Sequence, residues 1–324
     1  MTTVRSALND TLRDLMRNDA LVILLGEDIA GGQDPAGDGA LGGCFGVTAG
    51  LYREFGSSRV MDMPISETAF VGMAVGAAMT GLKPIVEIMF CDFMGVCFDQ
   101  IINQAAKKHY LSGGQRDLPL VIRTTYGAGE SSAAMHSQSL YGLLMQIAGL
   151  SVAVPSTPIE AEMVLRQAVD HTEPTVIFEH KNLYDQGDID WTPKKEQKPD
   201  YTVVALGAMA HKVKAVQEKL AEEGMRIDLI KPVWISPLDC APILESLGQT
   251  GRLFVVDEGT HQAGFADAVI AEVSRRGFDL LTEAPISITP PAYPIPYASD
   301  QEADWLPSEE DIFSAIKEEL KHAG

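Results

Sequence analysis

A run without a single charged side chain, residues 68–81, most constrains what this chain can fold into. Ser66 before it can cap a helix, and Glu67 falls in the first helical turn. The run has almost no polar face, so the sequence predicts a helix that is buried on all sides. Gly72 and Gly76 stand one turn apart, and because glycine weakens a helix, they indicate that another backbone comes very close.

The spacing of Glu67, Gly72 and Gly76 is typical of the pyrimidine-binding domain of thiamine diphosphate enzymes. From about residue 4 to residue 320, the sequence resembles one branch of these enzymes: the β subunit of the first component of 2-oxo acid and acetoin dehydrogenase complexes. The motifs that carry the resemblance are Gly26-Glu27-Asp28, Pro64-Ile65-Ser66-Glu67, Asp99-Gln100-Ile101-Ile102-Asn103-Gln104-Ala105-Ala106-Lys107 and His136-Ser137-Gln138. The segments 89–100 and 123–129 are most similar to acetoin dehydrogenase.

Two doubly wound α/β domains with parallel sheets are expected. Strands and helices alternate on both sides of a breaker-rich segment, which is the pattern of parallel sheets. The resemblance implies a thiamine pyrimidine-binding domain at residues 1–185 and a transketolase C-terminal-like domain at residues 201–324. Residues 186–200 would be the linker between them.

The resemblance implies catalytic roles for Glu67 and His136, and cofactor binding by Glu67, Phe93, Glu27 and Ile65. Glu67 would bond the aminopyrimidine ring, Phe93 would pack on that ring, and Ile65 would help to exclude water. Glu27 follows a predicted strand, where open α/β sheets place ligands, although a solvated loop acid is an equally good interpretation. His136 follows a loop rich in glycine and serine, and an imidazole suits proton transfer near neutral pH.

The diphosphate half of a thiamine site is expected to be missing from this chain. Gly37-Asp38-Gly39 resembles the start of the magnesium-diphosphate motif, but it lies in a glycine-rich loop and no Asn-Asn pair occurs in the sequence. A partner α subunit would therefore supply the magnesium ion and the diphosphate contacts within an α2β2 heterotetramer. No metal ligands are predicted here. A potassium site in the turn 170–173 stays open, because His171 and Glu173 replace the family's usual residues.

The expected function is that of a β subunit, active only with an α subunit, in an enzyme that cleaves acetoin and transfers the acetyl group to lipoamide. Oxidative decarboxylation by a pyruvate or branched-chain 2-oxo acid dehydrogenase is the alternative, because Ala148 departs from the usual proline at the edge of the pocket. A non-catalytic α/β scaffold subunit is a third hypothesis, from another class of protein.

The formal charge of −20 argues against nucleic acids and anionic membranes as partners and permits a basic protein partner. Scattered cysteines, the lack of a signal-peptide pattern and the lack of a long apolar run favour a cytoplasmic protein. The resemblance implies that the acidic C-terminal domain binds the lipoyl acyltransferase core. The acids that suggest this surface are Asp300, Glu302, Asp304, Glu309, Glu310, Asp311, Glu318 and Glu319.

Overall fold

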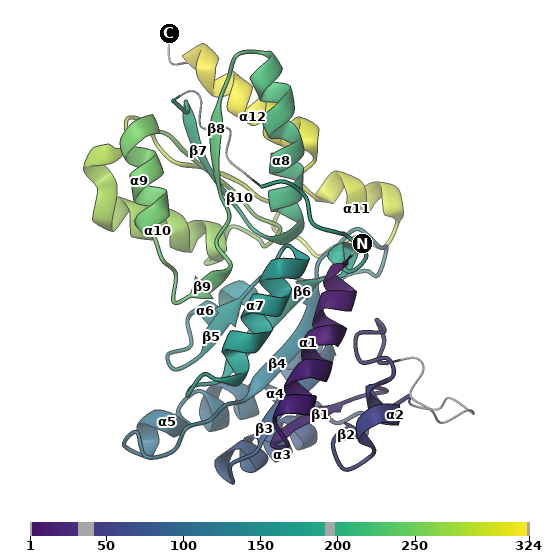
Figure 1. The fold of residues 1–324 in the computed structure, drawn as a ribbon. Helices are drawn as coiled ribbons and strands as arrows, with labels where there is room; N and C mark the ends of the chain where they lie inside the picture. The colour runs from purple at the N-terminus through teal and green to yellow at the C-terminus, as the bar shows by residue number, and fades with distance from the viewer. Residues whose placement is uncertain (1, 32–41, 192–197, 323–324) are drawn as a thin grey trace. The chain divides into compact units, whose positions relative to one another are not determined.

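The structure, a computed structural model, describes residues 2–31, 42–191 and 198–322. The candidate motif at residues 37–39 lies outside the described residues, as does part of the predicted linker. The chain forms two compact units, coloured by chain position in Figure 1. The first comprises Met1–Tyr126 and Leu144–Asp188, and the second comprises Gly127–Leu143 and Ile189–Gly324. The predicted boundaries place the loop 127–143 in the first domain, but in the structure this loop belongs to the second unit.

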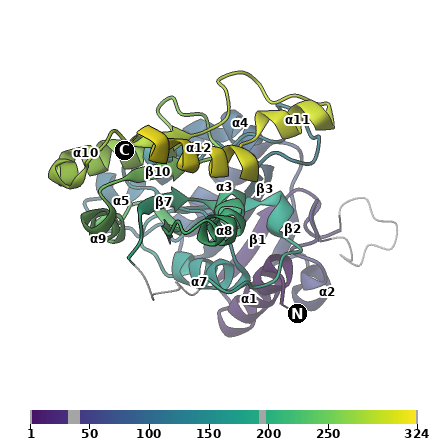
Figure 2. The same cartoon turned by 90° about the horizontal axis from the view of Figure 1, so that it is seen from above.

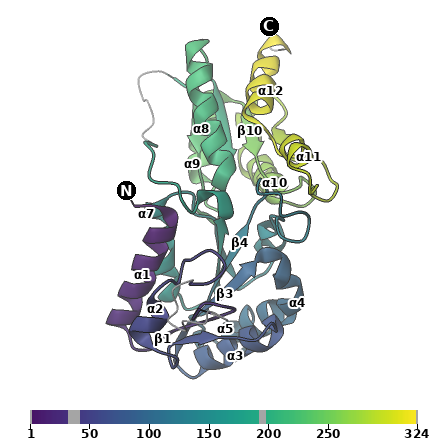
Figure 3. The same ribbon diagram turned by 90° about the vertical axis from the view of Figure 1, so that its right-hand side faces the viewer.

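The first unit is built on a parallel sheet with the strand order β2-β1-β3-β4-β6-β5. Its long strands are buried on both faces, which explains why they read as continuous apolar runs. Its helices α1 and α7 pack together on one side of the sheet, and α3 and α4 lie on the other (Figure 3). The bounds of the strands are β1 Val22–Gly26, β2 Val60–Asp62, β3 Lys83–Phe90, β4 Val121–Tyr126, β5 Ser151–Ala153 and β6 Thr175–His180. The helices are α1 Val4–Asn18, α2 Leu51–Phe55, α3 Glu67–Met79, α4 Met94–Asp99, α5 Lys108–Leu111 and α7 Pro158–Val169, and α6 Tyr141–Met145 includes the chain position at which the second unit gives way to the first.

Helix α3 begins where the sequence places it, but it is not buried on all sides. One face is buried, whereas Ala69, Met73 and Gly76 are exposed on the other. Ser66 is the N-terminal cap residue, yet its side chain makes no capping hydrogen bond. At Gly72 a side chain makes the close approach in place of the expected backbone: a Cβ there would lie 2.9 Å from Oε1 of Gln100.

The predicted long helix from residue 93 to 110 is interrupted. Cys97 has φ −115° and ψ 17°, which are not helical values, and a π-helical turn follows over Gln100–Ala105. Such π turns are rare and occur frequently at functional sites. The interruption lies beside α3, because the Thr68 hydroxyl donates to the carbonyl oxygen of Val96 at 2.7 Å.

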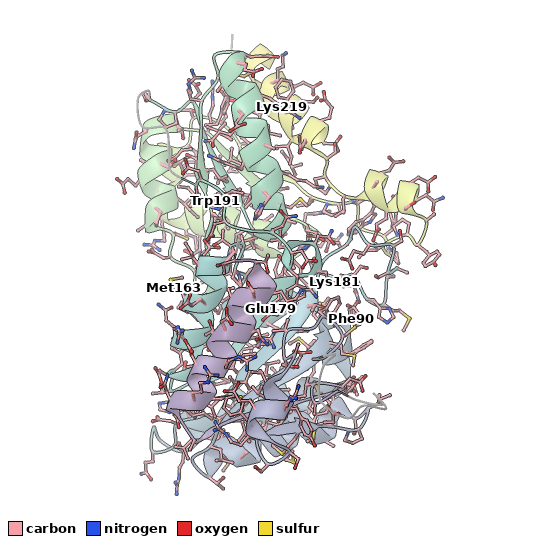
Figure 4. All side chains as sticks on the ribbon, turned by 45° about the vertical axis from the view of Figure 1, so that its right-hand side comes forward. Phe90, Met163, Glu179, Lys181, Trp191 and Lys219 are labelled. Atoms are coloured by element: carbon pink, nitrogen blue, oxygen red, sulfur yellow. The ribbon has the colours of Figure 1, made fainter. Side chains whose placement is uncertain are left out.

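A buried ionic network joins three neighbouring strands of this sheet. Arg123 on β4 donates two hydrogen bonds to Glu179 on β6, both at 2.7 Å, and one to Glu87 on β3 at 2.9 Å. Tyr184 also donates to Glu179, at 2.6 Å. Next to Glu179 in the chain, Lys181 places its ammonium 5.5 Å from the Phe90 ring centroid (Figure 4). Since one guanidinium faces two carboxylates, burial raises the pKa of Glu87 despite the Arg123 charge.

The second unit contains a four-stranded parallel sheet with the order β11-β10-β7-β8. Helix α8 packs against α12, as Figures 1 and 2 show. The short elements β9, β11 and α11 were not predicted, whereas the longer ones were. The bounds are β7 Tyr201–Ala205, α8 Gly207–Glu222, β8 Ile227–Ile230, β9 Trp234–Ser236, α9 Ala241–Thr250, β10 Leu253–Val256, α10 Phe265–Gly277, β11 Ile286–Ile288, α11 Ser299–Trp305 and α12 Glu309–His322.

The predicted fold class is confirmed, because two α/β units with parallel sheets are present. Among the described residues, no helix is both long enough and apolar enough to cross a bilayer.

Candidate functional site

Glu67 is the first residue of α3 and is 6% exposed. The chain reaches it from the end of β2, and the helix behind it is apolar. A carboxyl group at a helix N-terminus faces the positive end of the helix dipole. The structure therefore presents one buried acid at the start of an apolar helix, as the sequence predicts.

Glu27 follows β1 directly and shares the electrostatic environment of Glu67. Burial raises the pKa of Glu27, and the charges of Glu67 and Asp28 raise that pKa further. Its Oε1 atom is buried and accepts no hydrogen bond from the residues that the structure describes. The backbone beside it is unusual, because Asp28 has φ 57°. Two carboxyl groups that sequence analysis selected independently are thus brought together.

This pair of acids fits a ligand that carries both a basic ring nitrogen and an amino group. The nearby charge of Glu67 adds to burial in raising the pKa of Glu27, so the two acids are not equivalent as hydrogen-bonding groups. The orphaned oxygen of Glu27 is an acceptor that a ligand donor would satisfy. An aminopyrimidine has this combination of groups, and the residues present therefore fit the pyrimidine half of thiamine diphosphate.

Phe93 and Ile65 differ in their surroundings. Phe93 ends a 3₁₀ turn, Cys91–Phe93, that follows β3, and its half-buried ring contacts Phe90 edge-on with centroids 5.6 Å apart. Ile65 is 88% exposed, so within this chain it does not exclude water from Glu67 as expected. Ile65 is instead a large apolar side chain on the surface next to the site.

Cys97 is a neighbour of Glu67 that sequence analysis did not select. Its thiol is fully buried, and burial, with the added effect of the Glu67 charge, raises the pKa of Cys97 to about 12. The thiol is therefore neutral and unreactive at physiological pH. Its position follows from the interrupted helix, which no residue pattern indicated.

His136 lies on the loop 127–143, which belongs to the second unit. Its backbone N–H donates to the Ala133 carbonyl at 3.2 Å, and its side chain is half-buried. Ser131 and Ala133 have φ angles of 53° and 60°, a left-handed conformation that costs roughly 1–3 kcal/mol for each non-glycine residue. Such strain is concentrated at functional sites, because only a well-determined environment maintains it. Glu67 is thus buried at a helix start in the first unit, and His136 follows a strained backbone segment in the second unit.

Asp257 is a second residue that sequence analysis missed. It follows β10, its side chain is fully buried, and the Tyr141 hydroxyl donates to its Oδ1 atom. Burial raises the pKa of Asp257 to about 7, although the hydrogen bond from Tyr141 acts in the opposite direction. Its place at a strand end is the same signal that selected Glu27, and that signal would have found it.

A cationic side chain, that of Lys83 on β3, contacts the turn 170–173 through Asp170. Lys83 Nζ lies 3.0 Å from Asp170 and 3.2 Å from Asp19. His171 Nδ1 is 3.1 Å from the Thr175 hydroxyl. Over the described ranges, no group of three or more His, Cys, Asp or Glu residues is arranged to hold a metal ion.

Comparison with known proteins matches both units. Residues 1–186 match the transketolase pyrimidine-binding domain, and residues 191–312 match the transketolase C-terminal domain. The chain is 42% identical to the β subunit of acetoin:2,6-dichlorophenolindophenol oxidoreductase of Bacillus subtilis, over 98% of this chain and 97% of that one. It is 41% identical to the Cupriavidus necator protein of the same name, with the same coverage. It is 34% identical to the pyruvate dehydrogenase E1 component subunit β of Staphylococcus aureus, over 98% of both chains.

A solved structure, described as a split-gene transketolase in an inactive β4 tetramer, has the same fold. The TM-score is 0.77, the alignment covers 99% of both chains, and the sequences are 19% identical.

We predict that Asp257→Asn changes the pH dependence of stability. Because the folded-state pKa of Asp257 is about 7 and its ordinary value is 3.8, the folded chain keeps a proton that the unfolded chain releases. The stability that this proton contributes is present at acidic pH and is lost as the pH rises toward 7. Asparagine is neutral throughout, so it does not lose this stability. The free energy of unfolding of the variant minus that of the wild type should therefore be roughly 2–3 kcal/mol larger at pH 8 than at pH 5.

Denaturant unfolding at the two pH values measures this change, with Asp304→Asn on the exposed side of α11 as the control. An equal stability difference between Asp257→Asn and wild type at pH 5 and pH 8 would contradict a raised pKa.

Proposed function

Because this chain belongs to the family of β subunits of acetoin and pyruvate dehydrogenase first components, we propose that it is the β subunit of a thiamine-diphosphate-dependent enzyme that cleaves acetoin and transfers the acetyl group to lipoamide. The observation that carries this choice is the greater identity to the two acetoin subunits than to the pyruvate subunit. A pyruvate or other 2-oxo acid substrate remains the second candidate, since that relative also matches over nearly the full length. Turnover of acetoin and of 2-oxo acids by the enzyme reconstituted with its α subunit separates the two.

The two acids of the first unit would bind the aminopyrimidine ring. Glu67 would hold a proton at the ring nitrogen, and its burial strengthens that bond because water competes less. Glu27 would accept from the exocyclic amino group through the oxygen that otherwise lacks a donor. Phe93 offers an aromatic surface on which the flat ring would pack.

When bound, thiamine diphosphate supplies a carbon nucleophile that attacks a carbonyl group. His136 would move the proton at the substrate oxygen, because an imidazole can act as a general acid and a general base. The strained backbone before it would fix the direction of its ring.

The diphosphate and magnesium contacts would come from an α subunit in an α2β2 assembly. Support comes from α3, whose exposed side carries Ala69, Met73 and Gly76 and no charged side chain. Ile65, next to the site, is exposed as well. An apolar surface of this kind is typical of an interface between subunits. The part of the site that this chain lacks would then be completed at that interface.

We predict that Glu67→Gln keeps the fold and loses most of the activity. An amide cannot hold the same proton at the ring nitrogen, so the rate should fall on the order of a hundredfold or more. The measurement is steady-state turnover of acetoin by the reconstituted enzyme at saturating thiamine diphosphate. Circular dichroism and α-subunit binding serve as controls for folding. Turnover close to that of wild type would exclude Glu67 from the proposed role.

We predict opposite effects of Gly76→Ala on the chain and on the assembly. Apart from the adjacent residues and the backbone of α3 itself, no atom of the described residues lies within 4 Å of a Cβ at Gly76, so alanine should stabilise the isolated chain by about 0.5–1 kcal/mol through helix propensity. In the assembly, the added methyl group would separate two closely packed helices and weaken α-subunit binding at least tenfold.

Thermal unfolding of the isolated chain and titration with α subunit measure the two effects. Gly81→Ala is unsuitable as a control because Gly81 has φ 99°, whereas Gly95→Ala, also in open space on a helix, tests propensity at another position. Unchanged α-subunit affinity of Gly76→Ala would remove this face of α3 from the interface.

The acidic C-terminal surface that we propose for the acyltransferase core is smaller than the sequence suggests. Glu302 is buried, Glu309 pairs with Lys219 at 2.6 Å, and Asp311 accepts from Ser308 at the start of α12. Among the described residues of this surface, the acids that are exposed and form no ion pair are Asp300, Asp304, Glu310 and Glu318. Such charges steer association and are screened by salt.

We predict that reversing Asp300, Asp304 and Glu310 to lysine weakens binding to the acyltransferase core at least tenfold at low salt. The difference should shrink at high ionic strength, where exposed charges are screened. Calorimetric titration of the α2β2 enzyme with the core's subunit-binding domain measures both effects. A second variant with the same charge change elsewhere, Glu222→Lys, Glu245→Lys and Asp279→Lys, is the control. Equal losses in the two variants would point to net charge and against this surface.

A further inference from the structure

We infer that three acids of the C-terminal domain, Asp257, Glu258 and Glu302, hold the loop 127–143 in the conformation that His136 needs. Glu302 on α11 is the positioning residue that contacts Ser131, on the N-terminal side of His136. The inference rests on the proposed role of His136 and extends it, because sequence analysis selected neither Asp257 nor Glu258 and placed Glu302 only on the acidic C-terminal surface. All of the contacts that carry it lie within the second unit.

The three acids contact the loop on both sides of His136. Glu258 Oε1 accepts from the backbone N–H of Ala128 at 2.5 Å, and Glu302 Oε2 accepts from that of Ser131 at 2.7 Å. Beyond His136, the Tyr141 hydroxyl donates to Asp257. The loop is thus held by hydrogen bonds to three carboxyl groups, on both sides of His136.

Glu302 acts at the strained part of the loop. Ser131, whose N–H it accepts, has φ 53°, and Ala133 two residues later has φ 60°. These conformations persist only where surrounding contacts specify them. The carbonyl of Ala133 in turn accepts from the His136 N–H at 3.2 Å. A short chain of contacts therefore connects the Glu302 carboxylate with the backbone of His136.

Stability of the fold alone does not explain why a carboxylate occupies position 302. The Glu302 side chain is buried, and its Oε1 atom accepts no hydrogen bond from any described residue. A buried carboxylate with an unsatisfied oxygen destabilises a fold relative to a well-packed apolar side chain. The neighbouring Trp305 and Leu306 show that apolar side chains fill the positions around it. A carboxylate here is explained by its specific contact with the loop.

The far end of the loop has a backbone contact as well. A Cβ at Gly142 would lie 3.1 Å from the Cα of Gly264, so the two chain segments pack tightly at that point. Asp257 and Glu258 both follow β10, which forms a central strand of the second sheet. The acids therefore hold the loop against a rigid element, as precise positioning requires.

The test compares Glu302→Ala with Glu245→Ala in the reconstituted α2β2 enzyme. Glu245 on α9 belongs to the same unit and is exposed, so its removal changes the charge by the same amount without removing a carboxylate that contacts the loop. We expect Glu302→Ala to lower kcat for acetoin at least tenfold, to leave thiamine diphosphate affinity within about twofold, and to accelerate amide exchange in residues 127–143 at least tenfold. Glu245→Ala should change none of these quantities.

Glu302→Gln is the conservative variant, because its amide oxygen can still accept from Ser131. It should recover most of the kcat and of the exchange protection, and it carries the test if Glu302→Ala does not fold. Faster exchange with an unchanged kcat would overturn the positioning role, and unchanged exchange would overturn the contact itself. His136→Ala is measured in parallel: wild-type turnover in that variant would refute the proposed role of His136, whereas the exchange data would still report whether Glu302 holds the loop.

Discussion

Parallel strands all end at the same edge of their sheet, and the placement of polar groups in this protein depends on that constraint. Apart from the network of Arg123, Glu87 and Glu179 inside the first sheet, the strand interiors are mostly apolar, and acids that could meet a ligand are expected where a strand ends. Glu27 follows β1 and Asp257 follows β10, each buried and each with a carboxylate oxygen that lacks a donor among the described residues. The chemistry we propose starts from acids that the sheets place in this way.

Burial raises the pKa of both Glu27 and Glu87, but the two acids differ in their hydrogen-bond partners. Arg123 offers its guanidinium to both Glu87 and Glu179, and the result is a closed network inside the first sheet. Glu27 has a second acid, Glu67, as its neighbour, and its pKa rises. The first arrangement is satisfied and structural, whereas the second keeps unused hydrogen-bonding capacity for a ligand.

The two units contribute different kinds of constraint to the proposed site. The first unit holds the acids for the pyrimidine ring at the ends of rigid elements and exposes one apolar face of α3. The second unit includes the loop that carries His136 and supplies the carboxylates that contact its backbone. Residues 127–143 are thus contiguous in sequence with the first domain but depend on the second for their conformation.

The sequence by itself determined the α/β class, most of the longer elements, and Glu67 as an acid at the start of an apolar helix. These features depend on local periodicity and on single residues such as Pro64, which residue patterns report directly. Only the tertiary structure decided that α3 has an exposed face, that the helix after Phe93 is interrupted at Cys97, and that Glu302 is buried. Each of these depends on contacts between distant segments. The contact of Glu302 with Ser131 joins residues that are far apart in the chain, and no local pattern records it.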